Sequence, residues 1–382
     1  DISSAINFRD FLNFAAPDQE IFRPIMTDQV TTRTDINTFL RLAETYPVAD
    51  VRSPSEYNYG HIPGAFNIPL FNDKEREEVG TRYKQKGRTD AILRGLELTG
   101  PSMHRKLEQA LKIAAGGRLL VHCWRGGMRS EAMAWLFSMG GIETTLLEGG
   151  YKSYRHLVLE RLSENRKMIV LGGLTGSGKT HILKYLGEKG LQVIDLEGLA
   201  NHKGSAFGSL GQSPQPSSEH FANILYSRWK DLDPGRPVWL EDESRNIGSV
   251  FMPDGFYTNM QLNPAIVLLM DIKTRLPRLI EEYSCYGKDE LEASVMRISR
   301  RLGGDRSQAA IDAIKNGDFA SAIEITLQYY DKAYLYGLKR KETKEIVYIE
   351  TDTDDIEINA RKVVEAAEKL NRFISEILML IM

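Results

Sequence analysis

The glycine-rich run at residues 173–180, GLTGSGKT, constrains the fold of this chain more than any other segment. It matches the pattern G-x-x-x-x-G-K-[S/T], follows the apolar stretch 168–171 and precedes a helical stretch that starts at His181. A strand, a glycine-rich loop and a helix in this order form the phosphate-binding turn of a parallel α/β sheet. The glycines let backbone amides face a phosphate, Lys179 neutralises it, and Thr180 is placed to hold Mg²⁺. The predicted phosphate ligands are Gly173, Gly176, Ser177, Gly178, Lys179 and Thr180.

Acidic residues at the ends of two further apolar stretches extend this prediction. Glu241 and Asp242 end the strand expected at 237–240, and Asp195 follows the one expected at 191–194. A carboxylate at this edge of a sheet holds the Mg²⁺ beside bound phosphates. Asp195, Glu241 and Asp242 are therefore candidate metal or substrate ligands, with a solvated loop of charges as the competing interpretation. The loop does not distinguish a nucleotide from another diphosphate.

A second α/β pattern precedes the phosphate loop. Strands are expected at 48–51, 118–122 and 143–147, with helices at 104–115 and 130–139, and this alternation predicts a parallel sheet. A chain of 382 residues with 42% hydrophobic content can bury two cores. We predict an N-terminal extension of unknown role at 1–33, a first domain at 34–158, and a doubly wound α/β domain at 159–382. The second domain adds strands at 265–270 and 345–349, helices over 289–336, and an apolar tail at 373–381 that fits one side of a terminal helix.

A cysteine follows the strand expected at 118–122. Cys123 stands in the run HCWRGGMRS, residues 122–130, between that strand and the start of a helix. A helix N-terminus, together with Arg125 and Arg129, favours the thiolate form, which is the nucleophile. Cys123, Arg125 and Arg129 are therefore the candidate catalytic residues, and a small buried structural cysteine is the competing interpretation.

Charge and cysteine content limit the setting of the protein. Forty-nine basic and 52 acidic residues give a net charge of -3, so any nucleic-acid site is a local patch. Arg297, Arg300 and Arg301 form the densest basic cluster, and helical spacing puts Arg297 and Arg301 on one face. Two cysteines far apart in the sequence fit a reducing compartment, which predicts the cytoplasm. No apolar run approaches the length of a membrane span, so we expect no membrane role.

The first half of the chain resembles the rhodanese family. The resemblance rests on the cysteine loop and on two upstream blocks, 50–57 (DVRSPSEY) and 60–69 (GHIPGAFNIP). In that family the cysteine carries sulfur or selenium as a persulfide or perselenide. We interpret the upstream blocks as scaffold, in which Arg52 and Glu56 pair. Five residues separate Cys123 from Arg129, one more than in most single-domain rhodaneses, and this spacing also fits the Cys-x5-Arg-Ser loop of cysteine-dependent phosphatases.

The two halves together resemble the bacterial tRNA 2-selenouridine synthase family, whose members also act as geranyl-2-thiouridine synthases. The resemblance covers the chain from about Thr34 and is carried by residues 122–130, 147–152, 172–180, 195–208 and 241–245. It implies a rhodanese-like domain followed by a P-loop domain that resembles the nucleoside triphosphatases. It also implies a tRNA substrate with 2-thiouridine at the wobble position, which geranyl diphosphate alkylates on sulfur before selenium from selenophosphate displaces geranylthiol.

The same resemblance implies residue roles and partners. Lys179 and Thr180 hold the diphosphate, with Mg²⁺ as a candidate ion, and Cys123 carries selenium or assists its delivery. Candidate tRNA contacts are Trp124, Arg297, Arg300 and Arg301, and a selenophosphate-producing enzyme is a candidate partner. Two other classes remain open: an ATP-dependent kinase or nucleotide hydrolase with an attached rhodanese or Cys-x5-Arg phosphatase domain, and a non-catalytic tRNA-binding or sulfur-carrier module.

Overall fold

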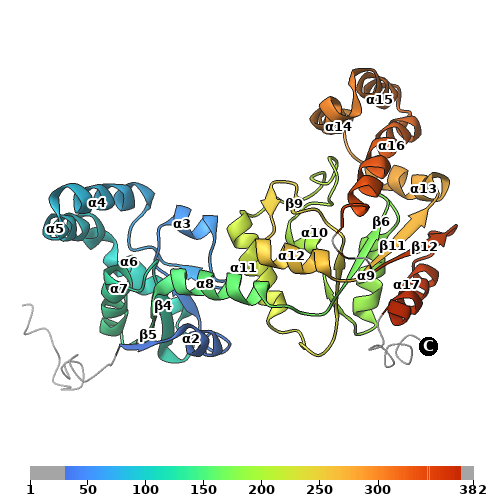
Figure 1. The fold of residues 1–382 in the computed structure, drawn as a ribbon. Coiled ribbons are helices and arrows are strands. Elements are labelled where there is room, and N and C mark those ends of the chain that lie inside the picture. Colours follow the sequence, from blue (N-terminus) through green and yellow to red (C-terminus); the bar gives the residue numbers. More distant parts are fainter. Residues whose placement is uncertain (1–30, 342, 344, 371–382) are drawn as a thin grey trace, which may run out of the picture. The chain divides into compact units, whose positions relative to one another are not determined.

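The computed structural model describes residues 31–341, 343 and 345–370 of the chain (Figure 1). Residues 1–30 of the predicted extension and the apolar tail at 373–381 lie outside the described residues. The chain forms two compact units. The first contains residues 31–57 and 64–153, and the second contains 58–63 and the described residues from 154 onward. The predicted boundary between residues 158 and 159 falls inside one helix, α8 (Gly150–Ser163).

A five-stranded parallel sheet organises the first unit. Its strand order is β1-β5-β4-β2-β3, so β4 is the central strand. The strands are β1 (Thr32–Thr34), β2 (Val48–Asp50), β3 (Phe66–Asn67), β4 (Arg118–His122) and β5 (Glu143–Leu147). The helices of this half of the chain are α2 (Ile36–Leu42), α3 (Pro54–Tyr59), α4 (Asp73–Lys86), α5 (Arg88–Thr99), α6 (Met103–Ile113), α7 (Met128–Met139) and the start of α8, with 3-10 turns at Gly100–Ser102 and Ala115–Gly117.

The second unit also contains a five-stranded parallel sheet. Its order is β12-β11-β6-β8-β7, so β6, the strand before the phosphate loop, is again central. The strands are β6 (Met168–Gly173), β7 (Gln192–Ile194), β8 (Val238–Glu241), β11 (Ala265–Met270) and β12 (Ile346–Thr351), and a separate antiparallel pair is formed by β9 (Asn246–Ile247) and β10 (Val250–Phe251). The helices are α9 (Lys179–Glu188), α10 (Leu196–Leu199), α11 (Ser218–Trp229), α12 (Asp254–Leu262), α13 (Ile272–Tyr283), α14 (Lys288–Leu302), α15 (Gly304–Asn316), α16 (Phe319–Leu338) and α17 (Ile356–Leu370).

Helices α14, α15 and α16 form a group of their own within the second unit, as their labels in Figure 1 show. They share a hydrophobic core with α13 that includes Leu279, Val295, Ile311 and Leu327. A separate core between the sheet and helices α9 and α17 includes Leu171, Ile182, Trp239 and Val363. The phosphate loop connects the sheet to α9, so it adjoins the second of these cores.

The predicted α/β fold class is confirmed. Strands at 118–122, 143–147 and 265–270 have the predicted bounds, because each is a nearly continuous buried run, as expected of a parallel sheet covered on both faces. Helix α6 ends two residues before the predicted position, since Ala114 leaves the helical conformation and Gly116 has a φ of +69°. Strand β1, which overlaps the predicted extension, pairs with β5, and helices α4 and α5 were not predicted.

The start of α8 holds the cysteine loop in place. The backbone N–H of Tyr151 donates to the carbonyl of Cys123 at 2.8 Å, and that of Lys152 donates to the carbonyl of Trp124 at 3.0 Å. Gly150 has a φ of +59°, and a Cβ at this position would overlap the carbonyl oxygen of Cys123 and lie 2.5 Å from the nitrogen of Gly126. Only glycine permits this close approach between the two backbone segments.

We predict that Gly150→Ala destabilises the first unit far more than Gly141→Ala. Gly141 also has a positive φ, +81°, but its Cβ would meet no atom within 4 Å, so its substitution costs only the backbone strain of about 1–2 kcal/mol. Gly150→Ala adds a steric clash to that strain. Urea unfolding followed by circular dichroism measures the free energy of unfolding of both variants. Equal losses of stability would contradict the close approach of Gly150 to the cysteine loop.

Candidate active sites

Cys123 lies at the end of β4, in the loop that leads into α7. Its side chain is 3% exposed, and its Sγ is 3.3 Å from the Oγ of Ser130 and 3.9 Å from the carbonyl oxygen of Gly127. The N-cap residue of α7 is Gly127, which has no side chain to bond the amides of the first turn. A helix N-terminus with unbonded amides attracts negative charge. The loop is therefore suited to stabilise Cys123 as a thiolate, or to hold another anion beside its Sγ.

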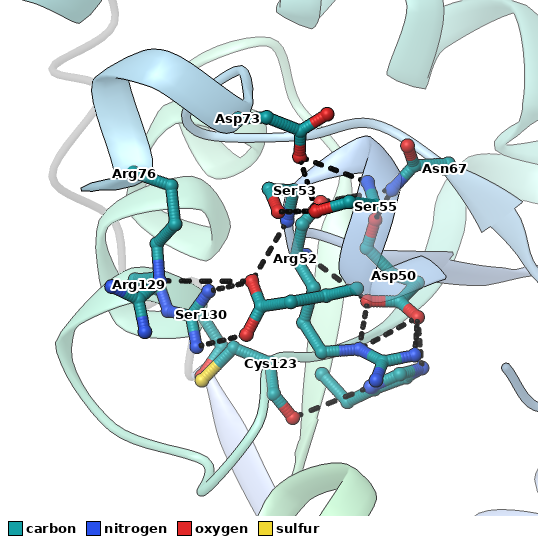
Figure 2. A network of polar contacts seen from close by, with 12 residues as sticks. Asp50, Arg52, Ser53, Ser55, Asn67, Asp73, Arg76, Cys123, Arg129 and Ser130 are labelled. Carbon is teal, nitrogen blue, oxygen red and sulfur yellow. Dashed lines mark hydrogen bonds and ion pairs between the residues drawn. The ribbon is translucent and has the colours of Figure 1, made fainter. Parts of the chain in front are cut away.

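Glu56 orients the loop arginine. The guanidinium of Arg129 donates to both carboxylate oxygens of Glu56, at 2.6 and 3.3 Å, and Arg76 Nε lies 3.7 Å from Oε2 (Figure 2). The expected pairing of Arg52 with Glu56 is wrong, because Arg52 pairs with Asp50. The upstream block is thus more than scaffold, since its glutamate contacts the arginine of the cysteine loop.

The charge of Arg129 stabilises ionised Glu56. Burial alone would raise the pKa of Glu56, but the hydrogen bonds and charge of Arg129, the N–H of Ser53 and the charge of Arg76 outweigh it. The pKa of Glu56 therefore lies below its ordinary value, and the ion pair is present at neutral pH.

A fully buried ion pair lies behind the cysteine loop. Arg52 donates to both oxygens of Asp50, and His122 Nε2 is 3.8 Å from Asp50 Oδ2 (Figure 2). Burial alone would raise the pKa of Asp50, but the charges of His122 and Arg52 keep it below its ordinary value. The Arg52 guanidinium also lies 3.7 Å from the ring centroid of Tyr151, whose ring is 5.7 Å from that of Trp124.

The predicted residues of the cysteine loop therefore have different surroundings. Cys123 and Arg129 lie among polar partners, whereas Arg125 is exposed and Trp124 is half-buried against Tyr151. Sequence reasoning missed Ser130 and Glu56 as members of the site, although both stood in the segments that carried the resemblance. Glu56 and Arg129 are 73 positions apart in the sequence, so no local pattern indicates that they meet.

The phosphate loop connects β6 to α9, as predicted. Gly176 and Gly178 have φ values of +82° and +81°, Gly178 is the N-cap of α9, and Lys179 Nζ donates to the carbonyl of Gly173 at 3.0 Å. Ser177 is fully buried, and its Oγ has no hydrogen-bond partner among the described residues. The turn thus has the conformation that directs backbone amides and a lysine at an anion.

Two arginines of α13 brace this loop, which the motif does not reveal. Arg275 is buried, pairs with Asp331, and donates to the carbonyl of Thr175 at 2.8 Å. The guanidinium of Arg278 lies where a side chain at Gly178 would project, and it lines the same pocket as the loop. Arg278 is therefore a second cation available to a bound phosphate.

The three acids predicted as metal or substrate ligands have other partners. Asp195 caps α10 by accepting the N–H of Gly198 at 2.6 Å, and Asp242 forms a buried ion pair with Lys341 and accepts from the Tyr334 hydroxyl at 3.1 Å. Glu241 is fully buried, and its Oε2 accepts the N–H of Leu196. Burial, and then the charges of Asp195 and Glu197, raise the pKa of Glu241 well above its ordinary value.

Another pair of carboxylates, Glu197 and Glu243, faces the phosphate loop. Thr180 Oγ1 donates to Oε2 of Glu197 at 3.2 Å. A Cβ at Gly204 would lie 2.8 Å from Oε1 of both Glu197 and Glu243, so the two carboxylates converge there. Burial, and then the neighbouring Glu197, raise the pKa of Glu243 well above its ordinary value. Among the described residues no three His, Cys, Asp or Glu side chains form a ready-made metal site, but two carboxylates, Thr180 and phosphate oxygens suit Mg²⁺.

The phosphate loop lies in a pocket of about 840 Å³ in the second unit. Arg297, Arg300 and Arg301 are all exposed; Arg297 and Arg301, which share a helix face, line this pocket, whereas Arg300 is not among the lining residues. His202 also lines it, with a side chain 8% exposed and an Nδ1 that has no hydrogen-bond partner in the described part of the chain. Burial and the charge of Arg297 lower the pKa of His202. The pocket is far larger than a diphosphate needs.

Comparisons with known proteins match both halves of the chain. A rhodanese-like domain model matches residues 35–157, and a model of the tRNA 2-selenouridine synthase AAA domain matches residues 166–365. The tRNA 2-selenouridine synthase of Nitrosomonas europaea is 34% identical over 356 residues, which cover 80% of this chain and 92% of that protein. The chain belongs to the tRNA 2-selenouridine synthase family.

Other members of the family show similar coverage. The tRNA 2-selenouridine synthase of Shewanella sediminis is 36% identical over 337 residues, covering 79% of this chain and 90% of that protein.

A crystal structure of the N-terminal domain of a protein from Clostridium difficile 630, described as a putative ATP/GTP binding protein, is 37% identical to this chain. It covers 34% of this chain and 99% of its own, and has a TM-score of 0.31.

We predict that Glu56→Gln destabilises the first unit in a pH-dependent way. Because the pKa of Glu56 is depressed in the folded protein, its ion pair stabilises the fold above the ordinary value of 4.5 and loses this contribution as pH falls. The variant should lose about 1–3 kcal/mol at pH 7, and the difference should narrow below pH 4.5.

The matched control is Glu131→Gln, which breaks the exposed ion pair with Arg33 and should cost less than about 1 kcal/mol. Urea unfolding at several pH values measures both variants. A pH-independent loss in Glu56→Gln would contradict the electrostatic role.

We predict that Lys341→Met strongly destabilises the second unit. The substitution leaves the carboxylate of Asp242 buried without its cation, which costs about 3–5 kcal/mol. Adding Asp242→Asn removes the uncompensated charge and should restore part of the loss. Urea unfolding of the single and double variants measures this coupling, and additive losses would contradict it.

Proposed function

We propose that this chain converts 2-thiouridine at the wobble position of tRNA into 2-selenouridine, through S-geranyl-2-thiouridine, with geranyl diphosphate and selenophosphate as co-substrates. The main support for this proposal is that one chain of this family holds a buried cysteine at a helix N-terminus and a phosphate loop in a pocket lined by arginines. The first site suits a sulfur or selenium anion, and the second suits a diphosphate leaving group near a nucleic acid.

The phosphate loop serves geranyl transfer. The 2-thio sulfur attacks C1 of the geranyl group, the C–O bond to the diphosphate breaks, diphosphate leaves with the electron pair, and the base loses its N3 proton. Lys179, Arg278 and the amides of the loop stabilise the negative charge that develops on the diphosphate. When Mg²⁺ is bound, it neutralises further charge, and Thr180, Glu197 and Glu243 are the side chains that would hold it.

The cysteine loop serves the exchange of sulfur for selenium. S-alkylation turns the sulfur into a leaving group and makes C2 of the base more electrophilic. A C2–Se bond forms, the C2–S bond breaks, and geranylthiolate leaves with the electron pair. Water cleaves the P–Se bond of selenophosphate and phosphate is released. Cys123 assists delivery of the selenium nucleophile, and Ser130 and the N-terminus of α7 stabilise the anion.

The remaining assignments concern the setting of the reaction. Arg297 and Arg301 contact phosphates of the tRNA, with Arg300 beside them on the same helix. None of the described helices is long and apolar enough to cross a membrane. We place the reaction in the cytoplasm and expect an enzyme that produces selenophosphate as the supplier of the second co-substrate.

The ion pair of Asp242 argues against a nucleotide hydrolase or kinase. In those enzymes a free carboxylate at the end of the strand beside the phosphate loop holds the metal. Here Lys341 and the Tyr334 hydroxyl occupy the carboxylate of Asp242. The carboxylates that remain next to Thr180 fit a cation that accompanies a leaving diphosphate.

The test is a two-step reaction with purified protein and Mg²⁺. Geranyl diphosphate is added to tRNA bearing 2-thiouridine, selenophosphate follows, and nucleosides are identified by mass spectrometry. We expect geranylthiouridine and then selenouridine. Unchanged nucleosides from folded protein, together with ATP turnover in the absence of tRNA, would contradict this proposal and favour a nucleotide hydrolase.

We predict different product patterns for two variants. Lys179→Ala should lose both products by at least about a hundredfold, since a charged group at the leaving diphosphate is removed and selenation follows geranylation. Cys123→Ser should let geranylthiouridine accumulate without selenouridine. Loss of geranylation in Cys123→Ser would contradict the division of labour. The control for Lys179→Ala is Lys184→Ala, an exposed lysine of the same helix that does not line the pocket.

A further inference from the structure

An apolar cavity adjoins the phosphate pocket. Its walls come from α13, α14, α15 and α16, and Thr175 of the phosphate loop lines it as well. Ser205, Leu279, Tyr283 and Tyr330 line both spaces, so the cavity and the phosphate pocket share a wall. A ligand bound at the loop therefore lies next to this cavity.

The lining of the cavity suits hydrocarbon. Apolar side chains from α14, α15 and α16 line it: Leu291, Ile314, Phe319, Ala322, Ile323 and Leu327. Two of the lining hydroxyl groups are bonded locally, since Thr326 Oγ1 donates to backbone carbonyls of α16 and the Tyr330 hydroxyl accepts the N–H of Ala206. No charged side chain is among the described residues that line it. A space with these properties takes apolar groups rather than water.

The size of the cavity limits what it can hold. Its volume, measured as space for the centre of a water-sized sphere, is about 30 Å³. About 10–15 Å³ on this scale accommodates one water molecule, so the cavity has room for two or three, or about one branched five-carbon unit. An unfilled apolar void costs stability, so hydrocarbon that fills this space stabilises the bound state.

We propose that this cavity receives the far end of the hydrocarbon chain of a prenyl diphosphate whose diphosphate is bound by the phosphate loop. The inference rests on the proposed function, which brings a prenyl diphosphate to Lys179. The first isoprene unit lies in the open pocket, where the thio sulfur reaches C1, and the second fills the cavity. The cavity thereby selects a ten-carbon chain over shorter and longer ones.

Chain-length preference is the property to measure. The probes are inorganic diphosphate and the dimethylallyl, geranyl and farnesyl diphosphates, titrated into the full chain with Mg²⁺ by calorimetry. The unaltered protein should bind geranyl diphosphate at least about tenfold more tightly than dimethylallyl diphosphate, because it buries one more isoprene unit. Equal affinities for these two compounds would overturn the proposal.

Two substitutions on α16 change the cavity in opposite directions. Ala322→Leu fills it and should remove the preference for geranyl over dimethylallyl diphosphate, while the affinity for inorganic diphosphate stays within about twofold. Ile323→Ala enlarges it and should improve binding of farnesyl relative to geranyl diphosphate at least about tenfold. A gain of this kind cannot result from misfolding, so it remains informative if Ala322→Leu is unstable.

Ile311→Ala is the matched control. Ile311 is buried in the same helical core but does not line the cavity, so its truncation should lower stability without changing chain-length preference. The same change of preference in Ile311→Ala, or no change in Ile323→Ala, would overturn the proposal. Failure of the unaltered protein to bind even inorganic diphosphate would instead contradict the proposed function, and the assignment of the cavity would fall with it.

Discussion

Both candidate sites depend on the same arrangement in a parallel sheet: the central strand ends in a short turn, and that turn leads directly into the N-terminus of a helix. Strands β4 and β6 are the third of five in their sheets, and each leads through a glycine-containing turn into a helix whose N-cap is glycine. Because the amides of that first helical turn have no bonded side chain, both turns attract anions. The two turns differ in the residues they carry: Cys123 places a sulfur atom in one turn, whereas Lys179 places a cation in the other.

Ion pairs between distant segments complete both sites. Glu56 holds the loop arginine Arg129, and Lys341 holds the carboxylate of Asp242, which the phosphate-loop motif alone would assign to a metal. Asp242 is thus occupied by Lys341, whereas Glu197 accepts a hydrogen bond from Thr180. The raised pKa of Glu243 reflects its burial and its nearness to Glu197. These ion pairs determine which charged side chains remain beside each of the two anion-binding turns.

The fold class and both loops could be predicted from the sequence, because apolar runs and glycine spacing are local signals. Strands at 118–122 and 265–270 are almost wholly buried runs, so their bounds were predicted, whereas α4 has no buried residue and gave no apolar period. The pairing of Glu56 with Arg129 spans 73 positions and that of Asp242 with Lys341 spans 99, so no local pattern reveals them. The cavity beside the loop arises from the packing of four helices, which the sequence does not specify.

The central claim is that the phosphate loop is needed for geranyl transfer alone and the cysteine loop for selenium transfer. The most direct measurement supplies Lys179→Ala with selenophosphate and tRNA that already carries S-geranyl-2-thiouridine, and quantifies selenouridine by mass spectrometry. The account predicts selenouridine at a rate within a few-fold of the unaltered protein, because the step that needs Lys179 has been bypassed. Absence of selenouridine from the folded variant, with Cys123 intact, would contradict the account.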